Sequence, residues 1–338
     1  MDKATIADVA KLAGVSIKTV SRVTNHEPNV ADATRVRVEA AVAQLGYRPN
    51  PSARSLASRR SYLVGLLYDN PSPSYLINVQ HGSLRTCRSE GYDLVIHPCD
   101  YRSGDLVTDL TTMLRQSRVD GVILTPPLSD LAQIVEVLQR REIAFVRIAP
   151  ADDKYEAQSI TTNDHDISAQ MTEHLIALGH RRIGFICGHP DHGAVCKRYD
   201  GYATALASAS LPLRQELIAQ GYNSVESGEH GANVLLDLDD PPTAIFAAND
   251  DMAAGTLRAA HERGILVPRD LSVAGFDDTP IAQQVWPSLT TIRQPIKQMA
   301  ERATALLLSQ LRDEPDTDAA RLIPCGLVLR DSTARAAR

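Results

Sequence analysis

Polar side chains that can hydrogen-bond a small molecule stand at the ends of apolar runs in the second part of the chain. They are Asp69 and Asn70 after YLVGLLY, Asn249 after TAIFAA, Asp277 after LSVAGF, and Arg198 after the glycine-containing loop GHPDHG. Carboxylate, amide and guanidinium groups that converge suit a polyhydroxylated ligand, because each hydroxyl both donates and accepts a hydrogen bond. Tyr75, Tyr222 and the single Trp286 can supply a flat face for a sugar ring.

Some of these positions have a purely structural alternative. Asn249 and Asp250 can cap the N-terminus of one helix, and Asp278 can cap another. Tyr222 and Trp286 are equally compatible with ordinary packing. Both interpretations stay open from the sequence alone.

The sequence carries no motif for catalysis. It lacks G-x-G-x-x-G after the first apolar run, and also G-x-x-x-x-G-K-S/T, G-x-S-x-G and H-E-x-x-H. His189, Asp191 and His192 lie in a Gly/Pro loop, where histidines more often serve the loop than a metal. The five cysteines contain no C-x-x-C pair and are expected to be small buried side chains. We therefore expect no catalytic residue, no metal and no cofactor.

Alternating strands and helices must position the polar residues. Short β-branched runs predict strands at 62–68, 93–97, 121–125, 144–148, 182–187, 217–221, 243–248 and 271–276. Helices are expected near 75–90, 104–117, 130–141, 165–178, 197–209, 225–236 and 250–263. Such units form parallel sheets covered on both faces, which predicts two doubly wound α/β lobes. Ligands of these sheets bind beyond the carboxyl ends of the strands, where the polar residues stand.

The segment 290–330 is expected to cross back between the lobes. LTTIRQP and RLIPCGLVL have the pattern of strands on either side of a helix at 296–311. Two lobes joined by several crossings make a hinged cleft.

The first 60 residues differ in charge from the rest of the chain. They hold ten Lys/Arg and five Asp/Glu, a net charge of +5, whereas the whole chain of 338 residues carries −6. The remaining residues therefore carry −11. A basic head on an acidic body indicates that the head meets a polyanion.

The head has the pattern of a helix-turn-helix. Thr5 and Asp8 fit a capping box at the start of a helix, Gly14 permits a tight turn after it, and Ser16 can cap the next helix. A third helix is expected from about Asp32 to the glycine at position 46. In this layout the second helix enters the major groove of DNA. The predicted DNA contacts of the head are Thr5, Ser16, Ile17, Lys18, Thr19, Ser21, Arg22 and Asn25.

These side chains have distinct expected roles. Arg22 can make a bidentate contact to guanine, Lys18 can reach base edges or phosphate, and Ile17 can touch a thymine methyl group. Donation to phosphates is expected from Thr5, Ser16, Thr19 and Asn25. The alternative is an ordinary three-helix bundle with a solvated basic face.

Residues 47–60, YRPNPSARSLASRR, are expected to be a hinge that folds on DNA. The segment is too apolar for a simple spacer and too short for a stable isolated helix. Leu56 can wedge between base steps in the minor groove, and Asn50 and Ala53 are further predicted contacts.

The head, hinge and body together resemble the lactose-repressor (LacI/GalR) family of bacterial transcription regulators. The resemblance rests on TIADVAKLAGVSIKTVSRVTN, VEAAVAQLGYRPNPSARSLA, LIALGHRRIGFICG, AIFAANDDMAAGTLRAAHERGILVPRDLSVAGFDD and PSLTTIRQP. It implies a periplasmic-binding-protein-like core, base reading by Ile17, Lys18 and Arg22, and effector contacts at Arg198, Asn249 and Asp277. The chain departs from the family pattern at Ala31, where a serine cap is usual, and at LYDNPSPSYLINVQHG.

The expected organisation has five parts. A helix-turn-helix head covers 1–46, a hinge 47–60, a first lobe 61–160 plus 292–322, a second lobe 161–291 plus 323–330, and a tail 331–338. The tail has no leucine heptads, so we expect a homodimer without a tetramerising coiled coil.

The function expected from the sequence is a ligand-controlled repressor of carbohydrate-utilisation genes. It would bind a pseudo-palindromic operator in double-stranded DNA and leave it when a sugar effector binds. The alternatives are a regulator activated by a co-repressor, a solute-binding module and a sugar-processing enzyme. No apolar run is long enough to span a membrane and the N-terminus has no apolar signal segment, so we expect a cytoplasmic protein.

Overall fold

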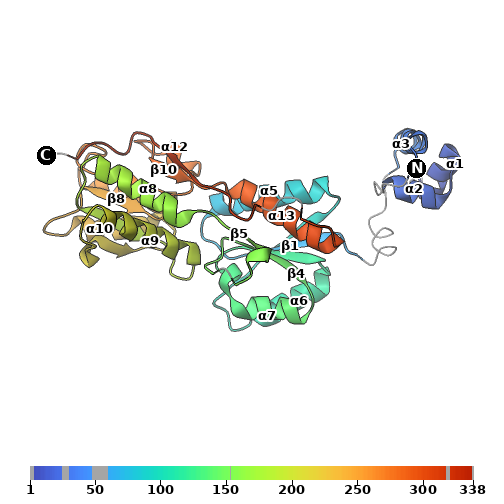
Figure 1. The fold of residues 1–338 in the computed structure, drawn as a ribbon, viewed down its shortest axis with the longest axis horizontal. Helices are drawn as coiled ribbons and strands as arrows, with labels where there is room; N and C mark the ends of the chain where they lie inside the picture. The colour runs from blue at the N-terminus through green and yellow to red at the C-terminus, as the bar shows by residue number, and fades with distance from the viewer. Residues whose placement is uncertain (1–3, 25–29, 48–59, 153, 317–319, 337–338) are drawn as a thin grey trace. The chain divides into compact units, whose positions relative to one another are not determined.

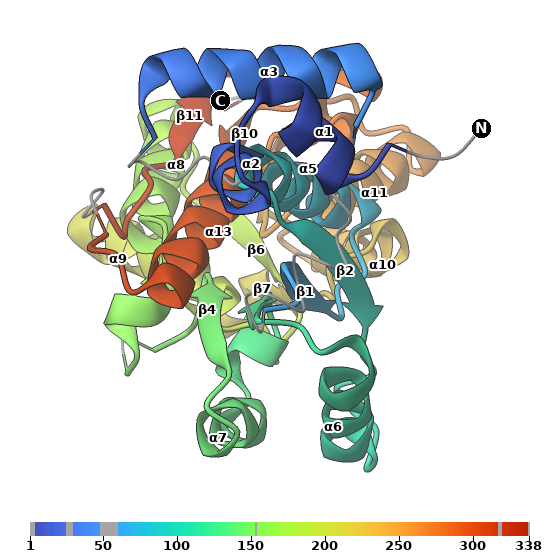
Figure 2. The same ribbon diagram turned by 90° about the vertical axis from the view of Figure 1, so that its right-hand side faces the viewer.

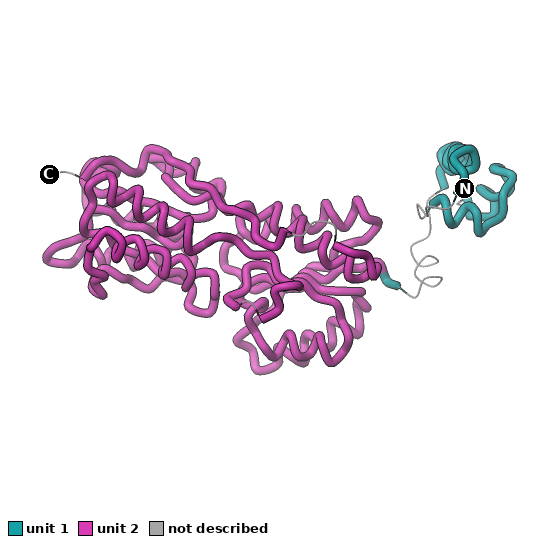
Figure 3. The backbone as a smooth tube through the Cα atoms, viewed as in Figure 1, with its two compact units in different colours: residues 1–61 teal, residues 62–338 magenta. Residues whose placement is uncertain are grey.

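The chain forms two compact units, residues 1–61 and 62–338 (Figure 3). The computed structural model describes residues 4–24, 30–47, 60–152, 154–316 and 320–336. Asn25, Asn50, Ala53 and Leu56, which were predicted to contact DNA, lie outside the described residues.

The first unit contains the helices α1 (Ile6–Ala13), α2 (Ile17–Thr24) and α3 (Asp32–Leu45). The predicted capping box is present, since Thr5 accepts from the amide of Asp8 and the Asp8 carboxylate accepts from the amide of Thr5. Gly14 ends α1 at φ +66°, in the left-handed region that glycine tolerates. The Ser16 hydroxyl accepts from the amide of Thr19, 3.1 Å away, and so caps α2 as expected. Apolar side chains from all three helices form its core: Val9, Ala10, Ala13, Val20, Val23, Val38 and Ala41.

The first lobe of the second unit is a parallel sheet with strand order β2-β1-β3-β4-β5. Its strands are β1 (Leu63–Tyr68), β2 (Asp93–Pro98), β3 (Gly121–Leu124), β4 (Ala144–Ile148) and β5 (Ser159–Ile160). Helices α5 (Pro73–Ser89) and α13 (Ile296–Arg312) cover one face, and α6 (Leu106–Ser117) and α7 (Ala132–Arg140) cover the other (Figure 2). The sheet therefore has an apolar core on each face, as predicted for a doubly wound lobe.

The second lobe repeats this plan with the strand order β7-β6-β8-β9. Its strands are β6 (Ile183–Cys187), β7 (Ile218–Gln220), β8 (Ala244–Ala247) and β9 (Ser272–Ala274). Its helices are α8 (Asp164–Ala177), α9 (Gly193–Ser208), α10 (Val225–Leu236), α11 (Asp250–Glu262) and the short α12 (Ile281–Gln284). In Figure 1, α8 and α9 lie together in this lobe, with α10 beside them. The predicted strands and helices are confirmed, except that α9 begins at Gly193 rather than near 197.

The chain crosses between the lobes at neighbouring places. The amide of Thr161 donates to Arg321 at 2.8 Å, and the amide of Cys325 donates to the side chain of Asn163 at 2.8 Å. Strand β10 (Thr291–Arg293) precedes α13 in the sequence and β11 (Gly326–Val328) follows it, and the two strands pair antiparallel. The prediction that 290–330 returns across the molecule is therefore confirmed, because α13 packs on α5 in the first lobe.

Candidate ligand cleft and nucleic-acid interface

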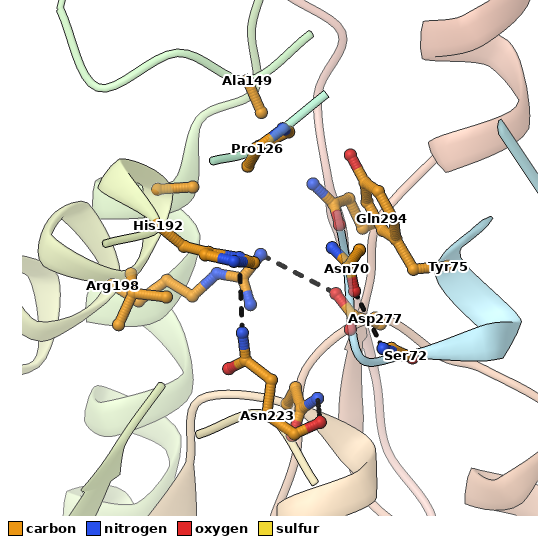
Figure 4. Close-up of a pocket in the computed structure, with 13 residues that line it drawn as sticks. Asn70, Ser72, Tyr75, Pro126, Ala149, His192, Arg198, Asn223, Asp277 and Gln294 are labelled. Carbon is orange, nitrogen blue, oxygen red and sulfur yellow. Dashed lines mark hydrogen bonds and ion pairs between the residues drawn. The ribbon is translucent and has the colours of Figure 1, made fainter. Parts of the chain in front are cut away.

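A cavity lies between the two lobes, at the carboxyl ends of the parallel strands (Figure 4). About 460 Å³ of this space holds no protein atom, which is within the range of small-molecule sites. The lining residues are Asn70, Ser72, Tyr75, Pro126, Ala149, His192, Ala194, Val195, Arg198, Asn223, Asn249, Asp277 and Gln294. The structure thus brings together five of the predicted ligand contacts, namely Asn70, Tyr75, Arg198, Asn249 and Asp277.

Arg198 is the fixed cation of this cleft. It stands on α9, is 7% exposed, and donates from Nε to Asp164 at 3.0 Å and from Nη1 to the carbonyl of Ala248 at 2.5 Å. Its guanidinium also lies 3.5 Å from the ring centroid of Phe276, a position that favours a cation over an aromatic face. These contacts hold the guanidinium plane in one orientation, with Nη2 3.7 Å from Asp277.

Asp277 follows β9 in a strained backbone conformation. Its φ is +113°, which non-glycine residues rarely adopt. Burial raises the pKa of its carboxyl group to about 7, against the opposing charge of Arg198. The Asp277 carboxyl is therefore close to half-ionised near neutral pH.

Some polar atoms around the cleft have no hydrogen-bond partner in the part of the chain that the structure describes. They are the hydroxyl of Tyr75, Oδ1 of Asp277 and Oε1 of Gln294. A buried polar atom without a partner costs free energy, so each of these atoms is available to a bound molecule. Figure 4 shows the side chains of these residues close together on one side of the cavity. The oxygens of Asp277 and Gln294 can accept hydrogen bonds and the Tyr75 hydroxyl can also donate one, so together they suit a ligand that carries several hydroxyl groups.

His192, Asn223 and Asn249 are further polar residues of the cavity lining. Asn249 caps α11 by accepting from the amide of Met252 at 2.9 Å, and its side-chain nitrogen donates to the carbonyl of Asn223 at 3.2 Å. The capping alternative for Asn249 is therefore correct, and the same residue also lines the cavity. Burial and the neighbouring His189 lower the pKa of His192 to about 4, so its imidazole is neutral at pH 7.

The groups described in the cleft carry no surplus positive charge. Arg198 is matched by Asp164 and Asp277, and His192 is neutral. An anionic ligand would find no unpaired positive charge to bind, because Arg198 is already paired with carboxylates. A neutral ligand needs no such charge, so this pairing does not weaken its binding. The geometry therefore favours an uncharged ligand.

Several predicted ligand residues lie outside the cavity lining. Asp69 accepts from the amide of Tyr101 at 3.0 Å, so its carboxylate serves the loop after β2. The Tyr222 ring is 49% exposed and packs edge-on against His189, and Trp286 is 89% exposed beyond α12. The flat face predicted from the aromatic residues is therefore reduced to Tyr75.

The aspartates with a proposed capping role bond elsewhere. Asp250 accepts from the amide of Thr279 at 2.7 Å and from the hydroxyl of Thr291 at 2.5 Å. Asp278 pairs with Arg293 at 2.7 Å and Arg330 at 2.5 Å, and the N-cap of the following helix α12 is Pro280, so the capping alternative does not hold for Asp278.

Four polar lining residues were not among the ligand contacts predicted from the sequence: Ser72, His192, Asn223 and Gln294. Asn223 follows β7, Gln294 follows β10, and His192 directly precedes α9. The rule that identified Asn249 and Asp277, polar residues at a strand end, applies to Asn223 and Gln294 as well. The pairing of β10 with β11 that positions Gln294 joins residues far apart in the sequence, Arg293 with Gly326 and Thr291 with Val328.

The head presents its polar residues on the surface of α2. Ile17 is 52% exposed and Lys18 is exposed, whereas Val20 and Val23 are buried. Ser21 and Arg22 are partly buried on the same helix. Thr5 donates to Asp8, and the hydroxyls of Ser16 and Thr19 lie 2.9 Å apart, so these side chains cap helices. This arrangement is the one that a helix needs to lie in a DNA groove.

Within the described residues, no helix is long and apolar enough to cross a membrane. The same residues contain no cluster of His, Cys, Asp or Glu that could hold a metal ion.

Comparisons with known proteins assign both units. Residues 5–50 match the sequence model of the bacterial regulatory proteins of the lacI family, and residues 172–333 match a periplasmic binding protein-like domain. The chain is 33% identical over 337 residues to the probable HTH-type transcriptional repressor ExuR of Bacillus subtilis (strain 168), with 98% of each protein covered.

Solved structures of the same architecture cover nearly the whole chain. The lac repressor dimer bound to operator and the anti-inducer ONPF has a TM-score of 0.78 at 30% identity, with 98% of this chain and 100% of that chain covered. The complex of the transcriptional regulator CelR with cellobiose has a TM-score of 0.75 at 30% identity, with 97% of this chain and 99% of that chain covered.

Proposed function

The chain belongs to the lacI family of bacterial regulatory proteins, and we propose that it is a repressor whose hold on operator DNA is weakened by an uncharged sugar in the cleft. The family membership makes it a ligand-responsive, DNA-binding transcriptional regulator. The proposal adds the chemical class of the effector and the direction of its effect.

The observation that carries the effector class is the set of unpartnered polar atoms in the cleft. Tyr75, Asp277 and Gln294 each offer an atom that accepts or donates no hydrogen bond within the described part of the chain. A sugar satisfies several such atoms at once, because each of its hydroxyls donates and accepts. The balanced charges around Arg198 favour a neutral sugar over an anion, and the complex of the similar regulator with cellobiose is consistent with a sugar.

The DNA-binding residues that we propose follow the exposure of α2. Ile17 and Lys18 face outward at its start, and Arg22 follows Lys18 by one turn. In this proposal Arg22 and Lys18 reach base edges and Ile17 contacts a thymine methyl group. The proposed phosphate contacts are Thr5, Ser16 and Thr19, and Ser21 is a further proposed DNA contact, while Asn25, Asn50, Ala53 and Leu56 stay predictions from the sequence.

We propose a homodimer on a pseudo-palindromic site. One head contacts few base pairs, and two heads on one dimer raise the effective concentration of the second. The similar lac repressor binds operator as a dimer. In the proposed organisation, residues 1–46 bind DNA, 47–60 form the hinge, and the cleft lies between 61–160 plus 292–322 and 161–291 plus 323–330. We propose that the protein acts in the cytoplasm, because its proposed partner is genomic DNA.

The experiment that tests this function uses the full-length chain, a library of genomic fragments and a panel of neutral sugars. A gel shift selects fragments that bind more tightly than random DNA of equal length, at a fixed salt concentration because phosphate contacts are salt-dependent. We expect specific fragments to bind, and at least one neutral sugar to release them. Retention of every fragment with all sugars, or tighter binding with a sugar, would overturn the induction mechanism. Binding no tighter than to random DNA would overturn the proposed function itself.

A further inference from the structure

A polar cluster spans the mouth of the cleft, outside the cavity lining. It contains Tyr101 and Arg102 from the loop after β2 and His189 and Asp191 from the loop after β6. The first pair belongs to the first lobe and the second pair to the second lobe. We name these four residues the mouth clasp.

The mouth clasp is joined by hydrogen bonds between the lobes. The Tyr101 hydroxyl donates to the Asp191 carboxylate at 2.5 Å, and Arg102 donates from Nη2 to Nε2 of His189 at 2.8 Å. Arg102 also donates from Nε to the Tyr101 hydroxyl at 2.8 Å, which couples the two cross-lobe bonds. The hydrogen bond from Tyr101 lowers the pKa of Asp191, so the carboxylate is charged at neutral pH.

The mouth clasp is continuous with the wall of the cavity. The His189 ring lies 5.1 Å from the ring of His192, a lining residue, and its backbone amide donates to the Asn223 side chain at 3.2 Å. The Asn223 side chain in turn lies 3.4 Å from Nδ1 of His192. Movement of the clasp therefore moves the residues that line the cavity.

Further contacts cross the cleft beside the clasp. The amide of Gly193, the first residue of α9, donates to the Asp130 carboxylate of the first lobe at 3.3 Å. The Ser72 hydroxyl donates to Asp251 of the second lobe at 2.9 Å. These contacts form only when the lobes are close, so they report lobe closure together with the clasp.

We propose that Tyr101, Arg102, His189 and Asp191 are positioning residues that hold the lobes closed and thereby set the affinity of the cleft for its ligand. The inference rests on the proposed function only in naming that ligand as the effector. The physical reason is that cross-lobe bonds exist in the closed state alone. Each bond therefore shifts the closure equilibrium by its full net free energy, and the apparent affinity follows the fraction of closed molecules.

Hydrogen exchange of the full-length chain, without DNA or ligand, tests the clasp directly. The variants are Tyr101→Phe, which removes one hydroxyl, and Asp191→Ala, which removes its acceptor. We expect the amides of 188–193, including the one that Gly193 donates across the cleft, to exchange about tenfold faster in either variant. The unfolding free energy should fall by no more than the same tenfold, about 1.4 kcal/mol, because each lost bond stabilises the closed native molecule alone. A larger fall would indicate a merely structural role.

The matched control is Tyr155→Phe, the same chemical change within the first lobe. The Tyr155 ring packs edge-on against Phe145 of β4, with centroids 6.0 Å apart. We expect exchange at 188–193 in this variant to equal that of the wild type. Equal exchange in Tyr101→Phe, Asp191→Ala and the wild type would overturn the clasp. Because the measurement contains neither sugar nor DNA, it is decided independently of whether the proposed effector is correct.

Discussion

The head and the cleft present their polar side chains in opposite ways. On α2, Lys18 and Ile17 are exposed and the small apolar residues behind them carry the fold. In the cleft, Arg198 and Asp277 are 7% and 8% exposed and are held by buried partners. A surface that binds a large polyanion needs exposed side chains that extend to it. A site for a small molecule needs polar groups that are held in fixed positions and shielded from water. Substitutions in the head should therefore change binding alone, and substitutions of the paired, buried groups of the cleft should change binding and folding together.

The largest effect expected from this contrast is on Arg198. Arg198→Met keeps the bulk of the side chain but leaves the buried carboxyl groups of Asp164 and Asp277 without their cation, which costs about 3–5 kcal/mol of unfolding free energy. The measurement is denaturant unfolding of the 62–338 unit within the full chain. A loss below about 1 kcal/mol, as for a surface ion pair, would show that the buried pairing is not structural.

The opposite behaviour is expected for Arg22 in the head. Arg22→Ala should weaken specific DNA binding by about 1–3 kcal/mol through the lost base contact. Unfolding of the 62–338 unit and sugar binding should be unchanged, since α2 belongs to the other unit. The test is fluorescence anisotropy with a specific fragment and a scrambled one. An equal loss on both fragments would assign Arg22 to phosphate contacts instead.

The pH dependence of sugar binding sharpens the description of the cleft. The pKa of Asp277 is about 7, and a sugar hydroxyl donates to the ionised carboxylate. Below this pKa a proton must leave before the sugar binds, so affinity should fall by up to about tenfold, or 1.4 kcal/mol, for each pH unit lost. Titration calorimetry between about pH 5.5 and 8, a range that brackets the pKa, should show this fall in sugar affinity with pH. The Asp277→Asn variant should show no such pH dependence. A flat wild-type profile would mean that the carboxyl group is not an acceptor for the ligand.

The smallest expected effect is that of Tyr75→Phe, a substitution in the cleft that should change sugar binding without weakening the fold. The Tyr75 hydroxyl has no hydrogen-bond partner among the described residues, so Tyr75→Phe should not lower the unfolding free energy. It should weaken sugar binding by about 0.5–1.5 kcal/mol, the net value of one hydrogen bond.

Tyr202→Phe is the matched control for this change. The Tyr202 hydroxyl is buried and donates to the carbonyl of Ile183 at 2.7 Å. Its loss should lower the unfolding free energy by about 1 kcal/mol and leave sugar affinity unchanged. Equal behaviour of the two variants would remove the argument that the Tyr75 hydroxyl awaits a ligand.

The same contrast explains how much of the molecule could be predicted from the sequence. The head follows from local signals: the Thr5–Asp8 capping box, the left-handed Gly14 and the Ser16 cap are all short-range, and each is present. The repeated strand–helix pattern likewise predicted both lobes, because periodicity is also local.

The cleft was predicted only in part, because its details depend on long-range contacts. Asp69 and Asn70 both follow β1, yet Asp69 is turned to the amide of Tyr101 and Asn70 lines the cavity. Nothing near Asp69 in sequence indicates its partner 32 residues away. Gln294 reaches the cavity through the crossing strands, and the mouth clasp joins loops 87 to 90 residues apart. Such pairings follow from the fold and not from the local pattern.

The account depends most on the coupling between cleft and head, and a linkage measurement tests it directly. The affinity of the full-length chain for a releasing sugar is measured by calorimetry with and without saturating operator fragment, and the DNA affinity with and without saturating sugar. We predict that operator lowers sugar affinity by the same factor as sugar lowers operator affinity, within about 5–150-fold. Identical sugar affinity in the presence and absence of operator would contradict the account.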